Sequence, residues 1–253
     1  MEQSMEIIEN RADWEQTYTS TWLAHYNETG ETKWDIYNRP DNKTAPSGKA
    51  VTLNTSKIML VSSAGSYIKD EQDAYDAEND VGHYTIRLIP SDIDFDKLAY
   101  AHTHYDHTAV NMDPQVLLPL VHLHNLVEAG EIGAITDNFV SFMGYQPNAA
   151  QVVDETIPLI IEAAKTEQAN AVLLVPSWPI CSQSVGLIAR ALEQEGIATT
   201  LTTWNAGRTR VTAPPRATFT KLNRGSTIGA PHNTEQQLRI LRETLALLEQ
   251  AAP

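Results

Sequence analysis

Apolar runs alternate along the chain with polar turns and with segments whose apolar residues recur at helical spacing. The short apolar runs predict strands within residues 57–67, 83–92 and 97–107. The longer periodic segments predict helices over 113–133 and 154–170. The clearest unit spans residues 171–204, where a run of Val and Leu, an amphipathic stretch and a second β-rich run follow one another. This order predicts a strand, a helix and a parallel strand.

Proline, glycine and capping residues mark where the predicted helices begin and end. Pro114 suits the first turn of the 113–133 helix, and Gly130 suits its end. Pro158 must lie in the first turn of its helix or cause a kink, because proline lacks the N–H that a helix interior needs. A closing helix is predicted over 234–252, with Thr234 as its N-cap.

The alternation of strands and helices predicts an α/β fold, with a mainly parallel sheet flanked by helices in Rossmann-like layers. Residues 51–253 are expected to form this domain. Residues 1–50 are rich in Asn, Thr, Asp and Trp, and we expect them to form an N-terminal arm that wraps the core. The chain therefore consists of a single domain with an arm.

Composition and charge exclude several classes of partner. With 253 residues, 42% of them hydrophobic, the chain is long enough to bury a full core. A formal net charge of −14 repels a phosphate backbone, so no nucleic acid partner is expected. The N-terminal residues do not resemble a leader, and no apolar stretch is long enough for a membrane span, so we expect a cytoplasmic protein without membrane contact.

The stretch HTHYDHTA, residues 102–109, has the spacing of a binuclear zinc hydrolase motif. Such a site needs further ligands from distant loops. Of the downstream histidines, His122 and His124 lie two residues apart in a predicted helix and so point to different sides of it. We therefore disfavour the binuclear site. The alternatives are core histidines satisfied by hydrogen bonds and a different catalytic use of His102, His104, Asp106 and His107.

The single cysteine, Cys181, excludes an internal disulfide and a cysteine-rich zinc site. It follows a predicted strand that ends at Pro176, and it falls at the start of the next helix. A thiol there feels the positive end of the helix dipole, which favours the nucleophilic thiolate. The alternative is that Cys181 is a small buried apolar residue, as lone cysteines often are.

The predicted strand ends should meet at one edge of the sheet, because parallel strands place their carboxyl ends together. We therefore predict one pocket lined by Cys181, Trp178 and the His102–His107 segment, with Ser62 and Ser63 on its rim. Tyr105 and Trp178 are candidates for an apolar wall of that pocket.

Weaker candidates for ligand binding lie elsewhere in the sequence. Residues Ser62, Ser63, Gly65 and Ser66 are candidates for a small anion nest or for a tight turn. Arg87 and Arg216 are candidates to pair with a substrate carboxylate, or they are ordinary surface charges. We predict no nucleotide cofactor, because no dinucleotide fingerprint is present.

Several short motifs, taken together and in order, resemble one known family. They are SSAGSY, HTHYDH, EAGEIG, SFMGY, VLLVPSWPICSQSVGLI and APPRA. Their order resembles the B component of glycine, sarcosine and betaine reductases and the B subunit of D-proline reductase, from about Val51 to the end of the chain. HTHYDH is similar to that family's histidine motif, which makes its likeness to the zinc hydrolase signature coincidental.

The resemblance implies an oxidoreductase that cleaves the C–N bond of a small amino-acid-like substrate. It also implies a hetero-oligomer, in which a partner subunit carries a pyruvoyl group that captures the substrate amine, and a thiol electron donor. In the family a selenocysteine stands immediately before a proline, in a Sec-Pro-x-Cys arrangement, and attacks the α-carbon. Trp178 occupies that position here, followed by Pro179 and Cys181.

Tryptophan cannot act as this nucleophile, so three hypotheses about the function stay open. The first is a diverged reductase with Cys181 as the thiol and the HTHYDH residues as general acid or base groups. The second is a binding or scaffold subunit without catalysis. The third is a metal-dependent enzyme that uses His102, His104 and His107 as ligands. We favour the first, because Cys181 and the histidines both follow predicted strands.

Overall fold

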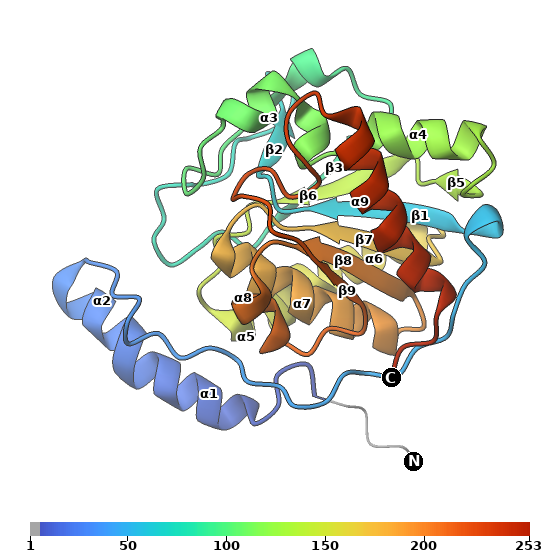
Figure 1. The fold of residues 1–253 in the computed structure, drawn as a ribbon. Coiled ribbons are helices and arrows are strands. Elements are labelled where there is room, and N and C mark those ends of the chain that lie inside the picture. The colour runs from blue at the N-terminus through green and yellow to red at the C-terminus, as the bar shows by residue number, and fades with distance from the viewer. Residues whose placement is uncertain (1–5) are drawn as a thin grey trace.

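The computed structural model describes residues 6–253 and contains a central, mostly parallel sheet. The strand order is β3-β6-β1-β7-β8-β9, and the short β5 also pairs with β1 (Figure 1). All pairs in this sheet are parallel except β3 with β6. The strands are β1 Lys57–Ser62, β3 Ile86–Pro90, β5 Ala134–Ile135, β6 Asn138–Phe142, β7 Ala171–Val175, β8 Ala198–Thr203 and β9 Ala217–Phe219. The predicted fold class is confirmed.

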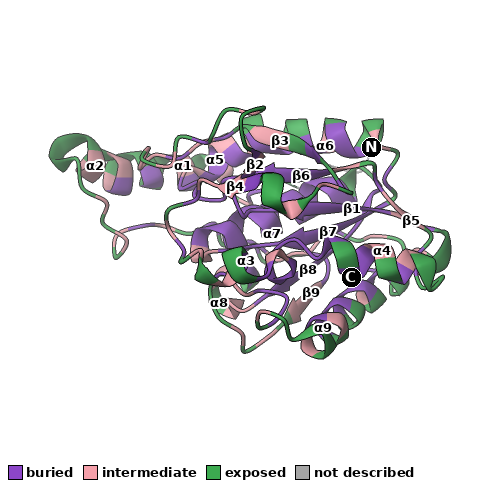
Figure 2. Cartoon of the chain, turned by 90° about the horizontal axis from the view of Figure 1, so that it is seen from above, coloured by how far each residue is buried: buried purple, intermediate pink, exposed green. Residues whose placement is uncertain are grey.

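Helices cover both faces of the sheet, so the strands lie buried between two layers (Figure 2). One layer contains α6 and α7, and the other contains α4 and α9 (Figure 1). The helices are α3 Thr108–Met112, α4 Leu120–Glu128, α5 Ala149–Gln151, α6 Ile157–Thr166, α7 Pro179–Gln194, α8 Ala206–Arg210 and α9 Thr234–Ala246. The predicted strand-helix-strand unit over 171–204 is confirmed as β7, α7 and β8.

Alternation along β1 divides the core into two clusters. Met59 and Val61 pack with the residues of α6 and α7. Ile58 and Leu60 point to the other face and pack with α4 and α9. Because successive side chains of a strand point to opposite faces, a strand covered on both sides must be apolar throughout. This explains why the sequence of β1 reads as a continuous apolar run.

The N-terminal arm is helical and joins the core through aromatic side chains. It contains α1 (Arg11–Tyr18), a π-helical stretch (Thr19–Leu23) and α2 (Ala24–Thr29). Trp14, Tyr18 and Trp22 stack on one another at centroid distances of 5.0 and 5.6 Å, and all three are buried. Spacing of four residues places them on one side of the helix. The boundary between arm and domain at residue 50 stays a prediction.

The predicted strand over 57–67 is interrupted in the structure. After β1 the chain turns at Gly65, whose φ is +68°, and continues as β2 (Ser66–Ile68). β2 pairs antiparallel with β4 (Leu98–Tyr100) in a separate two-stranded sheet. A Cβ at Gly65 would lie 2.8 Å from the Cβ of His102, so the turn needs glycine. β4 is shorter than predicted, and the histidine motif lies in the loop that follows it.

Prolines and caps shift the predicted helix ends. Over 113–133, a short 3₁₀ turn (Pro114–Val116) comes first, and α4 begins only after Pro119, because proline disfavours helical backbone at the preceding residue. Pro158 lies in the first turn of α6, as one of the two alternatives predicted. The prediction of Thr234 as N-cap is wrong, since the side chain of Asn233 accepts the Gln236 N–H instead.

No helix within residues 6–253 combines the length and the apolar character that crossing a lipid bilayer requires.

Arg216 does not lie where the sequence suggested a carboxylate-binding residue. Its guanidinium is buried and donates to the carboxylate of Glu193 on α7 at 2.9 Å. It also donates to three backbone carbonyls, those of Lys49, Thr199 and Gln250. All these acceptors belong to the protein itself, so Arg216 ties β9 to α7 and to both ends of the domain.

Removing one partner of this buried pair should be costly. We expect Arg216→Met to lower the free energy of unfolding by about 3–5 kcal/mol, because the Glu193 carboxylate would stay buried without a counter-charge. Urea denaturation measures the change. Arg239→Met is the control, since Arg239 pairs with Glu243 on the exposed side of α9 and its loss should cost less than about 1 kcal/mol. Equal losses in the two variants would contradict the prediction.

Candidate functional site

The loops after β1, β6 and β7 meet at one point at the carboxyl edge of the sheet. Ser63 follows β1, Gly144 follows β6 closely, and Ser177 follows β7. The Ser177 N–H donates to the Ser63 hydroxyl at 2.9 Å, and the Ser177 hydroxyl donates to the Ser63 carbonyl at 2.9 Å. β6 pairs with β1 on one side and β7 pairs with it on the other, so the strand order changes direction at β1. Open α/β sheets bind ligands at such a switch point, outside the carboxyl ends of the strands.

Cys181 lies at this point, in the first turn of α7. Its side chain is fully buried, and its Sγ lies 3.2 Å from Nε2 of His102 and 3.5 Å from the Ser177 hydroxyl. Gly144 makes room for the sulfur, because a Cβ there would lie 2.5 Å from Sγ and 2.6 Å from the Cβ of Ser63. The predicted convergence of Cys181 with the histidine segment is therefore found at His102, but the predicted open pocket is not. The sulfur is fully buried, and Cys181, Trp178 and residues 102–107 line none of the cavities found among the described residues.

Burial changes the protonation of both partners. It raises the pKa of the Cys181 thiol, although hydrogen bonds with Ser63 and Ser177 offset part of this effect. It lowers the pKa of His102 well below its usual value, and the neighbouring His104 and His107 add repulsion. Burial thus acts against the effect expected from the helix dipole, and it favours the neutral form of both Cys181 and His102.

The hydrogen bonds of His102 fix which ring nitrogen carries the proton. The His104 N–H donates to Nδ1 of His102 at 3.3 Å, which leaves the ring proton on Nε2, toward the sulfur. His102 can therefore donate to a thiolate at Cys181 and stabilise it. A proton leaving the thiol must be accepted by another group.

The remaining residues of the histidine segment point in different directions. The ring of His104 stacks on Tyr145 at 3.7 Å, and its Nδ1 has no hydrogen-bond partner among the described residues. His107 donates from Nε2 to the carbonyl of His102 at 2.8 Å. Asp106 is exposed and accepts from the N–H and hydroxyl of Thr108.

These orientations do not form a metal site. Within residues 6–253 no three His, Cys, Asp or Glu side chains are grouped so that they could hold one ion. His122 and His124, which do lie on α4, hydrogen-bond to Gln237 and to the carbonyl of Ser91. The geometry therefore does not support the hypothesis of a metal-dependent enzyme with His102, His104 and His107 as ligands.

The predicted binding residues lie around the thiol, but not all in the expected places. Tyr105 is buried beside His102 and donates its hydroxyl to the carbonyl of Ala64 at 2.9 Å. The prediction that Ser62 and Ser63 lie on the rim is wrong, since both are fully buried beneath the site. The hydroxyl of Ser62 donates to the carbonyl of Leu117, and that of Ser66 donates to Ser141. Their bonds hold the strand ends together.

Four rings, which we call the aromatic cover, contact one another beside His102, the partner of the thiol: Trp34, His104, Tyr145 and Trp178. Trp178 is central, with ring centroids 5.3 Å from His104, 5.6 Å from Tyr145 and 6.0 Å from Trp34. Trp34 comes from the arm and was not predicted from the sequence, because nothing in its own segment connects it with Cys181. The sulfur has no exposed surface, so a substrate can reach it only when some of the residues around it move.

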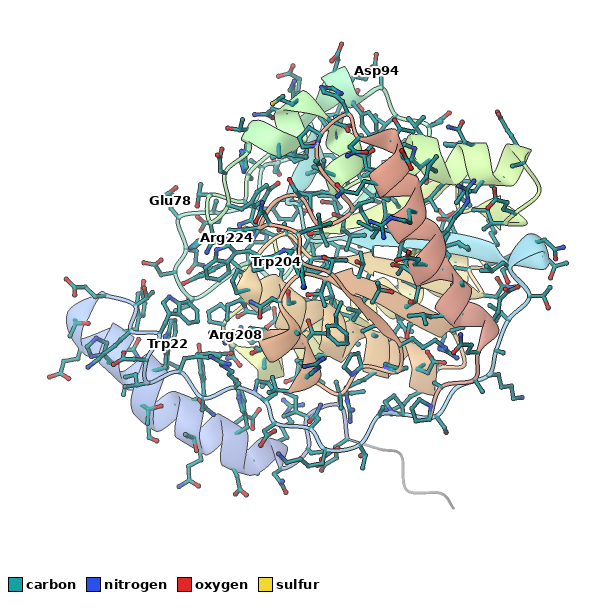
Figure 3. The ribbon with its side chains drawn as sticks, in the orientation of Figure 1. Trp22, Glu78, Asp94, Trp204, Arg208 and Arg224 are labelled. Atoms are coloured by element: carbon teal, nitrogen blue, oxygen red, sulfur yellow. The ribbon has the colours of Figure 1, made fainter. Side chains whose placement is uncertain are left out.

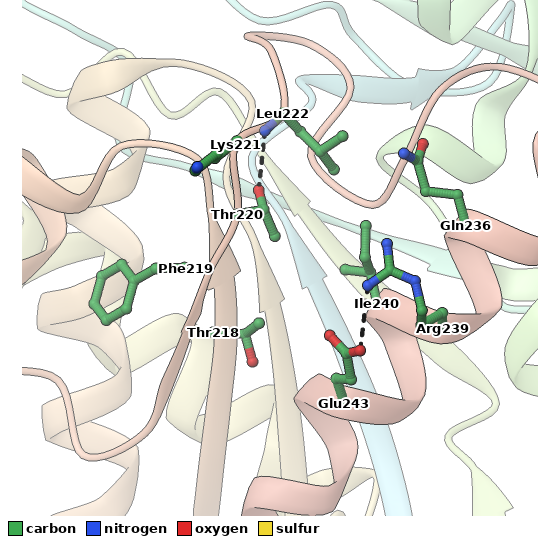
Figure 4. A pocket seen from close by; sticks show the side chains of 9 residues that line it. All are labelled: Thr218, Phe219, Thr220, Lys221, Leu222, Gln236, Arg239, Ile240 and Glu243. Carbon is green, nitrogen blue, oxygen red and sulfur yellow. Dashed lines mark hydrogen bonds and ion pairs between the residues drawn. The ribbon is translucent and has the colours of Figure 1, made fainter.

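Two other groups of residues lie outside the thiol site. A surface cavity of about 290 Å³ lies between β9 and α9, lined by Thr218, Lys221 and Arg239 among others, and includes none of the predicted site residues (Figure 4). Arg87 donates to the carbonyl of Asp73 and lies over the ring of Tyr75 at 4.5 Å.

Opening the aromatic cover should expose the thiol. We expect Cys181 to react slowly with iodoacetamide in the folded chain, because it is buried and its pKa is raised, and Trp178→Ala to increase the rate by about tenfold or more. Mass spectrometry measures the rate cleanly, since the chain has one cysteine. Trp204→Ala is the control, because Trp204 is outside the cover; an equal increase there would contradict the prediction.

The depressed pKa of His102 should make stability depend on pH. An unfolded histidine has a pKa of about 6.5, so below that pH the unfolded chain binds a proton that folded His102 refuses. The contribution of neutral His102 to the free energy of unfolding is complete above a pH of about 6.5, and it is lost as the pH falls toward the pKa of His102 in the folded chain. Between about pH 7 and pH 5, His102→Gln should therefore lose less free energy of unfolding than the wild type. Urea titrations test this, with His25→Gln on the arm as control; parallel curves for wild type and His102→Gln would contradict it.

Comparison with known proteins places this site in a family of reductase subunits. Residues 29–177 match the family described as glycine/sarcosine/betaine reductase selenoprotein B. The chain is also 29% identical over 196 residues to the D-proline reductase subunit gamma of Acetoanaerobium sticklandii, which covers 78% of this chain and 79% of that protein. No solved structure matches the chain.

The family match includes the histidine segment and the strand ends, and it stops at Ser177, one residue before Trp178. It starts earlier than the resemblance seen in the motifs, since it includes the end of the arm with Trp34. Because it spans more than half of the sequence, the chain belongs to the glycine/sarcosine/betaine reductase selenoprotein B family.

Proposed function

We propose that this chain is the substrate-reducing subunit of an amino-acid reductase and that Cys181 supplies the thiol for reductive C–N cleavage. The observation that carries the proposal is the contact of 3.2 Å between Cys181 Sγ and His102 Nε2 at the switch point of the sheet. Family membership supports a reductase role, and the relative named D-proline reductase supports a small amino acid as substrate.

In the first step the sulfur attacks the α-carbon of the substrate. A C–S bond forms, the C–N bond breaks, and the electron pair of that bond leaves with the nitrogen. His102 stabilises the developing thiolate through its Nε2 proton. The thiol proton ends on the departing nitrogen. His104 is suited to carry it, because its Nδ1 has no hydrogen-bond partner among residues 6–253 and burial lowers the pKa of its ring, which keeps the ring neutral.

A second step must remove the sulfur from the product. A donor thiol attacks Sγ of Cys181, the C–S bond breaks, and the carbon takes its electron pair together with a proton. This leaves a disulfide between Cys181 and the donor, which a second donor thiol reduces. Both electrons therefore come from two external thiols. The chain has no other cysteine, so the donor is a separate molecule of the thiol class.

Trp178 distinguishes this chain from the family pattern with selenocysteine. The resemblance equates Trp178 with the selenocysteine, and an indole cannot form the bond to carbon. Cys181, three residues later, must then act both as nucleophile and as the sulfur that is reduced. The pyruvoyl group implied by the resemblance would belong to a partner subunit, where it would activate the substrate amine.

Partner subunits also explain why the thiol is sealed. We infer that docking of a partner moves part of the aromatic cover and so admits the substrate only within the complex. A closed site would protect the thiol and its reaction intermediate from water and oxidants. A scaffold subunit without catalysis is the alternative, and it predicts that Cys181 is dispensable.

Co-purification followed by an assay tests the proposal. The tagged chain is purified from its native host, and the complex is incubated with dithiothreitol and glycine, sarcosine, betaine or D-proline. We expect one of these to be cleaved reductively, with D-proline giving a ring-opened amino acid, and we expect Cys181→Ser to abolish the reaction. Ser184→Ala on the same helix is the control and should retain activity. Full activity of Cys181→Ser would leave only the scaffold role.

A further inference from the structure

Several buried hydrogen-bond donors without acceptors lie in segments that follow β7 and β8. Among the described residues, the indole N–H groups of Trp178 and Trp204 and the Nη1 of Arg208 are buried and have no hydrogen-bond partner. Trp204 follows β8 directly, Arg208 lies on α8 just after it, and both are on the side to which the parallel strands point (Figure 3). Buried polar groups are nearly always paired, so buried donors without partners indicate that acceptors from another molecule bind there.

Arg224 adds a free positive charge directly above Trp178. Its guanidinium carbon lies 5.9 Å from the centre of the Trp178 ring, and the guanidinium makes no hydrogen bond or ion pair within residues 6–253. The loop that carries it is fixed to the site, because the Gly225 N–H donates to the carbonyl of Ser177 at 3.1 Å. The backbone beside Arg224 is thus fixed next to Ser177, and the side chain of Arg224 is exposed.

A second cation lies on the other side of Trp34. Arg208 is half-buried, with its guanidinium carbon 5.5 Å from the centre of the Tyr37 ring, and Tyr37 contacts Trp34 at 5.2 Å. Desolvation and the nearby Arg39 lower the pKa of Arg208, as expected for a cation that is partly buried without a counter-charge. Neither Arg208 nor Arg224 has an ion-pair partner within residues 6–253, and in a chain with a net charge of −14 such arginines point to an anionic ligand.

Acidic residues lie near His104. The segment with Glu78 and Asp80 lies close enough to His104 for its charge to act on that ring, and the Thr103 hydroxyl contacts the carbonyl of Ala77 at 3.4 Å. Negative charge therefore lies near His104, and positive charge lies near Trp178. A zwitterion bound between them would be oriented, with its amine on the side of His104.

We propose that Arg224, together with the indole N–H of Trp178, binds the carboxylate of the substrate and makes this site specific for amino acids over simple amines. A guanidinium can donate two parallel hydrogen bonds to a carboxylate, and the indole supplies a third donor. Arg208 adds a second positive charge, on the other side of Trp34. The inference rests on the proposed function and replaces the earlier candidates Arg87 and Arg216, whose guanidinium groups donate to carbonyls and, in Arg216, to Glu193.

Isothermal titration calorimetry of the purified complex tests this assignment. The ligands are D-proline against pyrrolidine and betaine against tetramethylammonium, so that each pair differs in the carboxylate. We expect Arg224→Gln to raise the Kd of the amino acid by roughly tenfold to a hundredfold and to leave the weak binding of the amine unchanged. Arg224→Lys should fall between, because it keeps the charge and loses the fork.

Arg210→Gln is the matched control. Arg210, like Arg224, is an exposed arginine, but its guanidinium carbon lies 4.7 Å from the centre of the Phe219 ring and not over a ring of the cover. It should bind the amino acids as the wild type does. Wild-type affinity in Arg224→Gln would overturn this inference and leave the proposed function intact. If the wild-type complex binds neither amino acids nor amines, the proposed function fails, and the inference fails with it.

Discussion

The contact between Cys181 and His102 depends on how closely three strand ends approach one another. The sulfur fits only because residue 144 has no side chain, since a Cβ would lie 2.5 Å from Sγ. Ser177, after β7, completes the approach by donating from its N–H to the hydroxyl of Ser63, after β1, and from its own hydroxyl to the Ser63 carbonyl. Gly65 makes room for His102 in the same way, because a Cβ at residue 65 would lie 2.8 Å from the Cβ of His102. The chemistry of the site thus follows from backbone packing at two glycines.

Burial has a stronger effect at this site than the helix dipole. The start of α7 favours a thiolate by up to about 2 kcal/mol in partly buried settings. Removing a charge from water costs several kcal/mol, and the pKa shifts of Cys181 and His102 both favour the neutral form. A resting neutral pair is stable and unreactive. Its reactivity must come from a change in environment, which the aromatic cover can provide by moving.

The sequence predicted the features that depend on local pattern. The strand, helix and strand over 171–204, the position of Cys181 at the helix start and its convergence with the histidine segment all follow from apolar periodicity and from the geometry of parallel sheets. The interruption after β1 was missed, because Gly65 is needed for contact with His102, and that contact joins residues far apart in the chain. Trp34 and Arg224 were missed for the same reason, since each belongs to the site only through tertiary packing against Trp178.

The arm connects the site to the rest of the molecule. Its stacked rings are followed by a tilted contact of Trp22 with Trp34 at 5.4 Å and an edge-on contact of Trp34 with Trp178 at 6.0 Å. A displacement of the arm would therefore remove one wall of the cover while the sheet and the thiol stay in place. Packed aromatic contacts have few alternative arrangements, so such a change would be a switch between two states and not a gradual loosening. The arm lies at the periphery of the fold (Figure 1), where a partner subunit can reach it, and this makes it the most direct route by which assembly can control access to Cys181.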